Sequence, residues 1–197
     1  NMNNEHKDYY RAVPISTEFT YDLDNEVTET SDYRELISLL RYAGEDDVVR
    51  ININNYGGHL TTCIAIVNAI RSCKALTVGV LSSVAYSAAG AIWMACKAQE
   101  VGRHCGFMAH PASGGDYGTL HQRKQAADHT LEMLRSLYED VYEGFLTKEE
   151  IEGILESDDL WLNEKEIRER LEKRDAYFQQ LESSAEAEAD RLLDEMF

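Results

Sequence analysis

Basic residues are scarce in this chain of 197 residues: 19 lysines and arginines stand against 36 aspartates and glutamates, a formal net charge of −17. Nucleic acids and anionic membranes both require a basic surface, so neither is expected as a partner. Long apolar runs are also lacking, and no uninterrupted stretch is long enough to cross a bilayer. The N-terminal residues do not contain the apolar segment of a signal peptide. We therefore expect a cytoplasmic protein.

The chain also lacks the short motifs that hold metals and nucleotides. Its four cysteines form no Cys-x-x-Cys pair and are scattered through apolar stretches, which favours buried reduced thiols over disulfides or a metal site. No glycine-rich phosphate loop followed by Lys and Ser or Thr is present. We expect no metal and no other cofactor. With 44% hydrophobic residues, the chain is long enough for one sizeable core.

Apolar periodicity in the first half predicts alternating helices and strands. Residues 31–43 have helical spacing, residues 48–53 are typical of a strand, and a second helix closes near Cys73. The apolar run 76–81 predicts another strand. A strand, a helix and a strand in so short a span form a βαβ unit, which implies a parallel sheet with a right-handed crossover.

The second half is expected to be mainly helical. The apolar run that starts at Ser87 suits one buried helix, and the capping-box sequence Thr147-Lys148-Glu149-Glu150 opens another. A loop over residues 157–162 precedes a last helix capped by Asn163, whose apolar face is too thin to bury much alone. The remaining expected elements are two short strands, 100–103 and 106–108, and helices over 119–145 and 148–156.

Ser87 stands at a strand-to-helix junction, where unpaired backbone N–H groups carry partial positive charge. A single serine at such a place is ordinarily a helix cap. A serine protease needs a hydroxyl nucleophile, an imidazole base, a carboxylate that fixes the imidazole tautomer, and N–H donors for the oxyanion. His110 follows a strand and opens a glycine-rich loop. Asp159 lies beside Leu160 and Trp161, which we expect to shield it from water.

The pair Gly57-Gly58 directly follows a buried strand. Glycine is needed where a backbone adopts positive φ or approaches another group closely. A simple turn between a strand and a helix is the alternative interpretation of this pair.

Four segments, collinear within residues 48–165, resemble those of ClpP, the proteolytic subunit of the Clp protease. The family's Asn-Ser-Pro-Gly-Gly corresponds to Asn54-Asn55-Tyr56-Gly57-Gly58, and its Ala-Ser-Met-Gly-Ala to Tyr86-Ser87-Ala88-Ala89-Gly90-Ala91. Its Met-Ile-His-Gln-Pro-x-Gly-Gly corresponds to Met108-Ala109-His110-Pro111-Ala112-Ser113-Gly114-Gly115. Its Arg-Asp-x-Phe-Leu-Ser corresponds to Asp158-Asp159-Leu160-Trp161-Leu162-Asn163.

This resemblance implies an α/β ClpP/crotonase-like fold of repeated ββα and βαβ units, with residues 119–145 as a projecting handle helix. It divides the chain into an N-terminal arm (1–30), a protease domain (31–165) and a charged helical extension (166–197). It implies a homo-oligomer of stacked heptameric rings that cleaves peptides or unfolded proteins fed by an AAA+ unfoldase. The implied site comprises nucleophile Ser87, base His110, carboxylate Asp159, oxyanion donors Gly58 and Ala88, and groove residues Gly57, Gly114 and Gly115.

The chain departs from the family pattern at four positions. Tyr56 replaces a proline, and Pro111 has moved next to His110. Asp158 stands where the family usually has an arginine that contacts the other ring, and Leu171 replaces a glycine, so the last helix is expected to run on.

We also expect Leu134 and Leu137, on the long helix 119–145, to form a subunit interface.

Three other functions remain open at this point. The protein could be a non-catalytic ring subunit, which the presence of Ser87, His110 and Asp159 disfavours. It could be a crotonase-like acyl-CoA enzyme, which needs paired backbone N–H groups and no serine nucleophile. A serine-lysine peptidase would use Lys97 or Lys124 as its base in place of His110.

Overall fold

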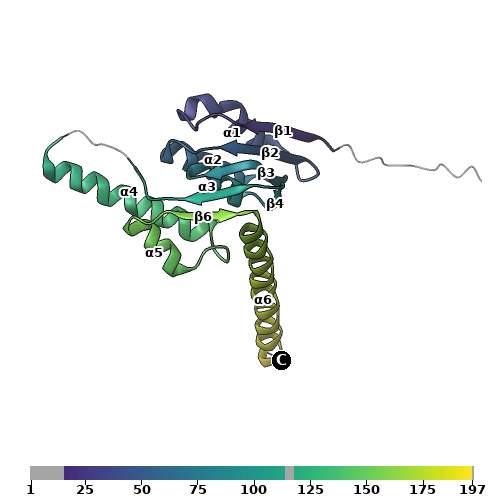
Figure 1. Cartoon of the computed structure of the whole chain (residues 1–197). Helices are drawn as coiled ribbons and strands as arrows, with labels where there is room; N and C mark the ends of the chain where they lie inside the picture. The colour runs from purple at the N-terminus through teal and green to yellow at the C-terminus, as the bar shows by residue number, and fades with distance from the viewer. Residues whose placement is uncertain (1–15, 114–117, 197) are drawn as a thin grey trace, which may run out of the picture.

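The computed structural model describes residues 16–113 and 118–196. One mixed sheet forms its centre, with strand order β1-β2-β3-β5-β6 and β4 paired to β3 (Figure 1). The long strand β3 pairs in parallel with β2 along its length, with β4 through its first half and with β5 through its second half. The strands are β1 (Glu18–Leu23), β2 (Val48–Asn55), β3 (Leu76–Tyr86), β4 (Ala98–Val101), β5 (Gly106–Ala109) and β6 (Leu160–Asn163).

Helices connect and cover these strands. The βαβ unit predicted from the sequence is confirmed as β2-α2-β3, and the α/β fold class with it. Every residue of α3 is buried, because this helix packs against β3, α2 and α4. The helices are η1 (Thr30–Tyr33), α1 (Arg34–Tyr42), α2 (Leu60–Ser72), α3 (Ala88–Ala95), α4 (Leu120–Val141), α5 (Lys148–Glu156) and α6 (Glu164–Met196).

Small residues let α3 approach the sheet closely. A Cβ built on Gly90 would lie 2.8 Å from the Phe107 ring and 3.1 Å from the Tyr142 hydroxyl. On β3, a Cβ on Gly79 would lie 2.7 Å from the Trp93 ring, whose indole N–H donates to the Gly79 carbonyl at 3.0 Å. These contacts fix the depth at which α3 sits, and therefore the position of its first turn.

Several boundaries differ from the sequence-based expectation, and β4 covers Ala98–Val101 instead of residues 100–103. The strand predicted for residues 76–81 runs on to Tyr86, because the polar pair at 82–83 is tolerated on an exposed stretch of β3. The predicted loop 157–162 contains β6, which pairs antiparallel with β5, a partner distant in sequence. The helix predicted over 119–145 ends at Val141, whereas α5 has the predicted bounds and its Thr147–Glu150 capping box.

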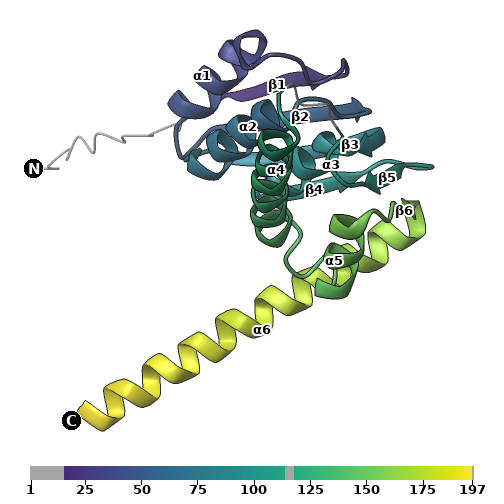
Figure 2. The same cartoon turned by 90° about the vertical axis from the view of Figure 1, so that its left-hand side faces the viewer.

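The last helix, α6, has a packed end and a projecting end. Asn163 caps it as predicted, accepting from the Glu166 N–H at 3.0 Å. Arg170 forms a two-bonded pair with Glu150 of α5, at 2.8 and 2.6 Å, and also donates to the Phe145 carbonyl at 3.0 Å. All residues from 179 to 195 are exposed, and Figure 2 shows α6 running far beyond the body. The expected helical extension is therefore tied to the body through its first turns.

Candidate active site

Ser87 occupies a sharp turn between β3 and α3. Its φ of 56° is positive, which is rare for a residue other than glycine and is typical of strained positions at functional sites. Its N–H donates to the Met108 carbonyl of β5 at 2.7 Å, and its carbonyl accepts from Gly90 at 3.0 Å. The Ser87 side chain makes no capping hydrogen bond to α3. Ser87 therefore occupies the N-cap position of α3 without capping it through its side chain, and the hydroxyl is available for another purpose.

Gly57 and Gly58 pass directly against this turn, and both have positive φ. A Cβ on Gly57 would lie 2.7 Å from the Ser87 Cβ, and one on Gly58 would lie 2.0 Å from the Val27 carbonyl oxygen. Val27 is hydrogen-bonded on both sides of Gly58: its N–H donates to the Gly57 carbonyl and its carbonyl accepts from His59, each at 2.8 Å. The predicted close approach at this pair is confirmed.

Asn55, at the end of β2, shapes the glycine turn, a role that the sequence reasoning missed. Its buried side chain accepts from the Gly57 N–H at 2.7 Å. The amide nitrogen of Asn55 donates to the carbonyls of Leu23 and Asn25. An asparagine two residues before paired glycines is the signal in the sequence that indicates such a turn.

Two backbone N–H groups beside Ser87 have no acceptor among the described residues: those of Gly58 and Ala88. Ala88 is the first residue of α3, so its N–H has no partner within the helix. Both residues line the same cavity as Ser87. These two donors can therefore bind a negatively charged oxygen next to the serine.

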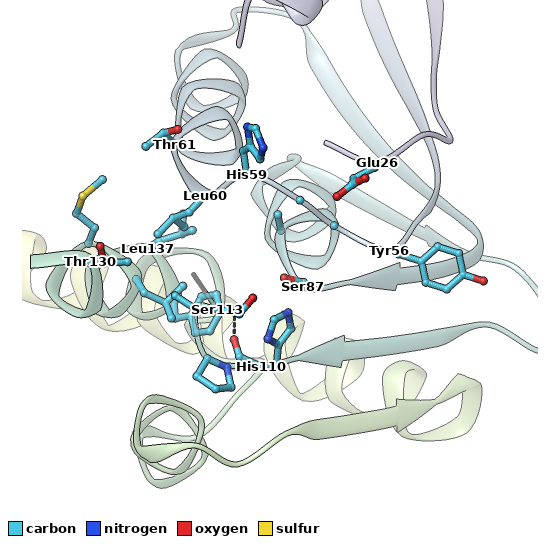
Figure 3. A pocket seen from close by; sticks show the side chains of 18 residues that line it. Glu26, Tyr56, His59, Leu60, Thr61, Ser87, His110, Ser113, Thr130 and Leu137 are labelled. Atoms are coloured by element: carbon cyan, nitrogen blue, oxygen red, sulfur yellow. Dashed lines mark hydrogen bonds between the residues drawn. The ribbon is translucent and has the colours of Figure 1, made fainter. Parts of the chain in front are cut away.

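His110 directly follows β5 and lines this cavity, which has a volume of about 770 Å³. Figure 3 shows the Ser87 hydroxyl and the His110 imidazole facing the same space. The His110 carbonyl accepts from the Tyr138 hydroxyl of α4 at 3.0 Å. Burial raises the pKa of Tyr138, so its hydroxyl keeps its proton and remains a donor. Tyr138 thus anchors the segment that carries the histidine, a contact the sequence does not reveal.

Asp159 is placed next to His110 by strand register. Ala109 of β5 pairs with Leu160 of β6, so the next residue outward on each strand is His110 and Asp159 respectively. The ladder ends at the Ala109–Leu160 pair, and within a ladder antiparallel partners lie about 5 Å apart at Cα. The structure therefore brings the backbones of His110 and Asp159 together.

The Asp159 side chain, however, is not in the Ser87 cavity. Asp159 is exposed, and it lines a separate hollow with Glu149, Glu150 and Asp158. No hydrogen bond joins it to His110 in the described part of the chain. The expected shielding by Trp161 is wrong, because that ring is 57% exposed and packs edge-on against Tyr86 instead.

Other reactive groups lie away from this cavity. Lys97 donates to the carbonyls of Cys73 and Ala75 after α2, and Lys124 pairs with Asp128 within α4. Neither lysine lines the cavity, so neither is positioned as a base for Ser87. All four cysteines are free and buried, as predicted, and burial raises the pKa of Cys63 to about 12.

The expected interface residues on α4 require a correction. Leu134 is 3% and Leu137 is 7% exposed, because both pack into the body of their own chain and line the cavity. Leu120 and Leu131 are the apolar side chains that α4 exposes. Gly114 and Gly115, expected in the substrate groove, lie outside the described residues.

Residues 16–113 and 118–196 contain neither a metal-binding cluster nor a membrane-spanning helix. No cluster of three or more His, Cys, Asp or Glu side chains there could hold a metal ion. None of the helices described has both the length and the hydropathy that a bilayer crossing requires.

Comparison with known proteins agrees with the geometry. A family model for Clp protease matches residues 4–170. No curated protein matches the chain. The match ends within the first turns of α6, so the exposed part of that helix lies outside it.

Proposed function

The chain belongs to the Clp protease family, and on this premise we propose that it is a serine endopeptidase that uses Ser87 as nucleophile and His110 as base. The Ser87 oxygen attacks the peptide carbonyl while His110 accepts the hydroxyl proton and later donates it to the leaving amine. The N–H groups of Gly58 and Ala88 bind the oxyanion that forms. Asp159 holds the imidazole in the required tautomer.

One observation carries this proposal: Ser87 sits in a positive-φ turn and faces His110 across a cavity. Among the described residues, its hydroxyl caps no helix, and two N–H groups of the same cavity have no acceptor. A hydroxyl, a base and oxyanion donors are the parts required for acyl transfer. A residue that served only as a structural turn would not need the other three groups around it.

In this proposal, the side chain of Asp159, the third residue of the triad, must rotate toward His110. Its exposed side chain is free to turn, and the β5–β6 register already keeps its backbone beside His110. We propose that contact with a neighbouring subunit orients the Asp159 carboxylate toward the imidazole. The isolated chain then holds an incomplete triad that assembly completes.

The proposed assembly is a homo-oligomer of stacked heptameric rings that encloses the active sites, receiving chains from an AAA+ unfoldase. Figure 1 shows the first half of α4 extending beyond the sheet, and this half exposes Leu120. Together with Leu131, that side chain leaves apolar surface for a second subunit. We expect cleavage of short peptides by the protein alone and almost no cleavage of folded proteins without the ATPase.

The test is peptide hydrolysis by the Ser87→Ala variant, with circular dichroism to verify its fold. Loss of the hydroxyl should abolish hydrolysis, because no other group can form the acyl-enzyme. Ser83→Ala, an exposed serine on the same strand, is the matched control and should retain full activity. Hydrolysis near the wild-type rate in Ser87→Ala would reject the proposal.

A further inference from the structure

The cavity around Ser87 has two chemically different ends. Figure 3 shows Leu137 and Thr130 on one side of Ser87, and Glu26 and Tyr56 on the other. The first end is lined mainly by apolar side chains of α2 and α4, with Thr130 among them. The second end carries a carboxylate that the reaction described above does not use.

Hydrogen bonds and a β-bridge hold the backbone around Glu26 against the glycine turn at Gly57 and Gly58. The Glu26 carbonyl accepts from the Tyr33 hydroxyl at 3.1 Å. The preceding carbonyl, of Asn25, accepts from the Asn55 side chain, and the following residue, Val27, pairs with Gly58. Because these contacts hold both neighbouring residues, the backbone of Glu26 has a fixed position at the rim of the cavity.

Glu26 is also electrically uncompensated. It is the one carboxylate among the described residues that line the cavity, and these include no lysine or arginine. No described lysine or arginine forms an ion pair with it, and of the two histidines that line the cavity, His59 lies 3.7 Å from Glu29. The excess of acidic residues in the whole chain adds to the negative potential at this rim. A positively charged group arriving with a substrate would therefore be attracted to this end.

We infer that Glu26 is a specificity-determining residue, which selects peptides that carry a lysine or arginine near the scissile bond. The basic side chain pairs with the Glu26 carboxylate, while an apolar side chain on the other side of the bond enters the α2–α4 end of the cavity. The exposed Tyr56 ring provides an aromatic face for the stem or the guanidinium of the same side chain. This inference rests on the proposed function, since it concerns the substrate of the same site.

The experiment uses quenched peptides that contain one leucine and differ at a single position. Four positions are varied, namely the two that precede the leucine and the two that follow it. Arginine, glutamine or glutamate is placed at one of these positions in each peptide. At one or more positions, wild-type protein should cleave the arginine peptide about fivefold faster in kcat/KM than the glutamine peptide, as a partly exposed ion pair allows. This preference should weaken as salt is added.

Three variants separate the outcomes. Glu26→Gln should equalise arginine and glutamine peptides, and Glu26→Lys should favour glutamate peptides. Asp24→Asn removes an exposed carboxylate of the same loop that does not line the cavity, and it should keep the wild-type preference. An arginine preference that is absent from the wild type, or that survives in Glu26→Gln, overturns the inference alone.

A second readout covers the case in which no peptide is turned over. The labelling rate of Ser87 by a pair of peptidyl phosphonates, one with arginine and one with glutamine, is followed by intact mass. Faster labelling by the arginine reagent, lost in Glu26→Gln, supports the inference, and equal rates overturn it. If neither reagent labels Ser87, the proposed function fails, and the inference fails with it.

Discussion

Ser87 and Asp159 each lie one residue from a strand end in the same sheet, but the structure holds them differently. Ser87, after β3, is fixed by the hydrogen bond from its backbone N–H to the Met108 carbonyl and by the close approach of Gly57. Asp159, before β6, has a fixed backbone but an exposed side chain in a different hollow. The serine side of the candidate site is thus preformed in the single chain, whereas the Asp159 side is not.

This difference indicates where each part of the activity is controlled. The serine turn depends on packing within the chain, chiefly the buried α3 and the two glycines. The position of the Asp159 carboxylate depends on what covers an exposed loop, which another subunit can supply. If so, changes at Asp159 should impair turnover without affecting the serine turn, and changes at the glycines should impair both.

After the complete loss expected for Ser87→Ala, the largest effect is expected from Asp159→Asn. An asparagine would hold the wrong tautomer of His110, so kcat should fall by about 10⁴, as in the best-studied triad. Asp158→Asn is the matched control and should have far less effect, because position 159 directly precedes Leu160, the strand partner of Ala109, which directly precedes His110. Peptide hydrolysis at saturating substrate measures both. A larger fall of kcat in Asp158→Asn than in Asp159→Asn would assign the triad carboxylate to Asp158 and contradict the comparison of Ser87 with Asp159.

Gly58→Ala should have the next largest effect, through the preformed side. Its Cβ would collide with the Val27 carbonyl, which must shift the turn and its N–H donor. Loss of one oxyanion donor lowers kcat by about 10² to 10³. Gly44→Ala is the control, because a Cβ there meets its nearest neighbour at an ordinary 3.5 Å. Unchanged kcat in a folded Gly58→Ala protein would argue against this N–H as a donor.

Sequence reasoning was most successful where the signal is local. The capping box at Thr147 located α5, and the run from Ser87 located α3, because cap chemistry and apolar periodicity are encoded in consecutive residues. It failed for β6, since a four-residue strand is defined by its partner β5. It also misjudged Leu134 and Leu137, because a helix face that packs on its own chain has the same pattern as one that packs on another.

The same limit applies to the candidate site. Ser87, His110 and the glycine pair were identified from the motifs, and the structure brings them together around one cavity. The shielding of Asp159 was predicted wrongly, because the exposure of its side chain depends on the orientation of the neighbouring Trp161 side chain, which the sequence does not reveal. Glu26 was not singled out, since it comes to the cavity through the pairing of Val27 with Gly58, a contact between distant segments.

A smaller effect is expected from Leu131→Asp on α4. Leu131 is 39% exposed, so burying its side chain at a subunit interface would contribute about 1–2 kcal/mol per subunit. A charge there should weaken assembly, measured by sedimentation velocity, and peptide hydrolysis should fall in parallel because Asp159 loses its support. Glu132→Ala, on an exposed neighbouring position, should change neither. Full activity of a dissociated Leu131→Asp protein would show that the Asp159 side needs no partner.

The smallest effect is expected from Arg170→Gln, which loosens the packing of α6 on α5. Hydrogen bonds from Arg170 lower the pKa of Glu150 below its ordinary value of 4.5. The pair therefore stabilises the fold above that pH, and its contribution disappears as the pH falls through the lowered pKa. Solvent screening limits the loss to about 1 kcal/mol near pH 7. Urea unfolding at several pH values should show a difference that shrinks in acid, where only the loss of the Arg170–Phe145 hydrogen bond remains.

Labelling of Ser87 by a fluorophosphonate in wild type and in His110→Ala tests the central claim most directly. If the serine turn and His110 are preformed in the single chain, the reagent should modify Ser87 alone, even in dissociated protein, as peptide mass mapping would verify. His110→Ala should then be labelled at least about 10³-fold more slowly, because the hydroxyl has lost its base. Equal labelling rates in the two proteins, or modification of another serine, would contradict the account.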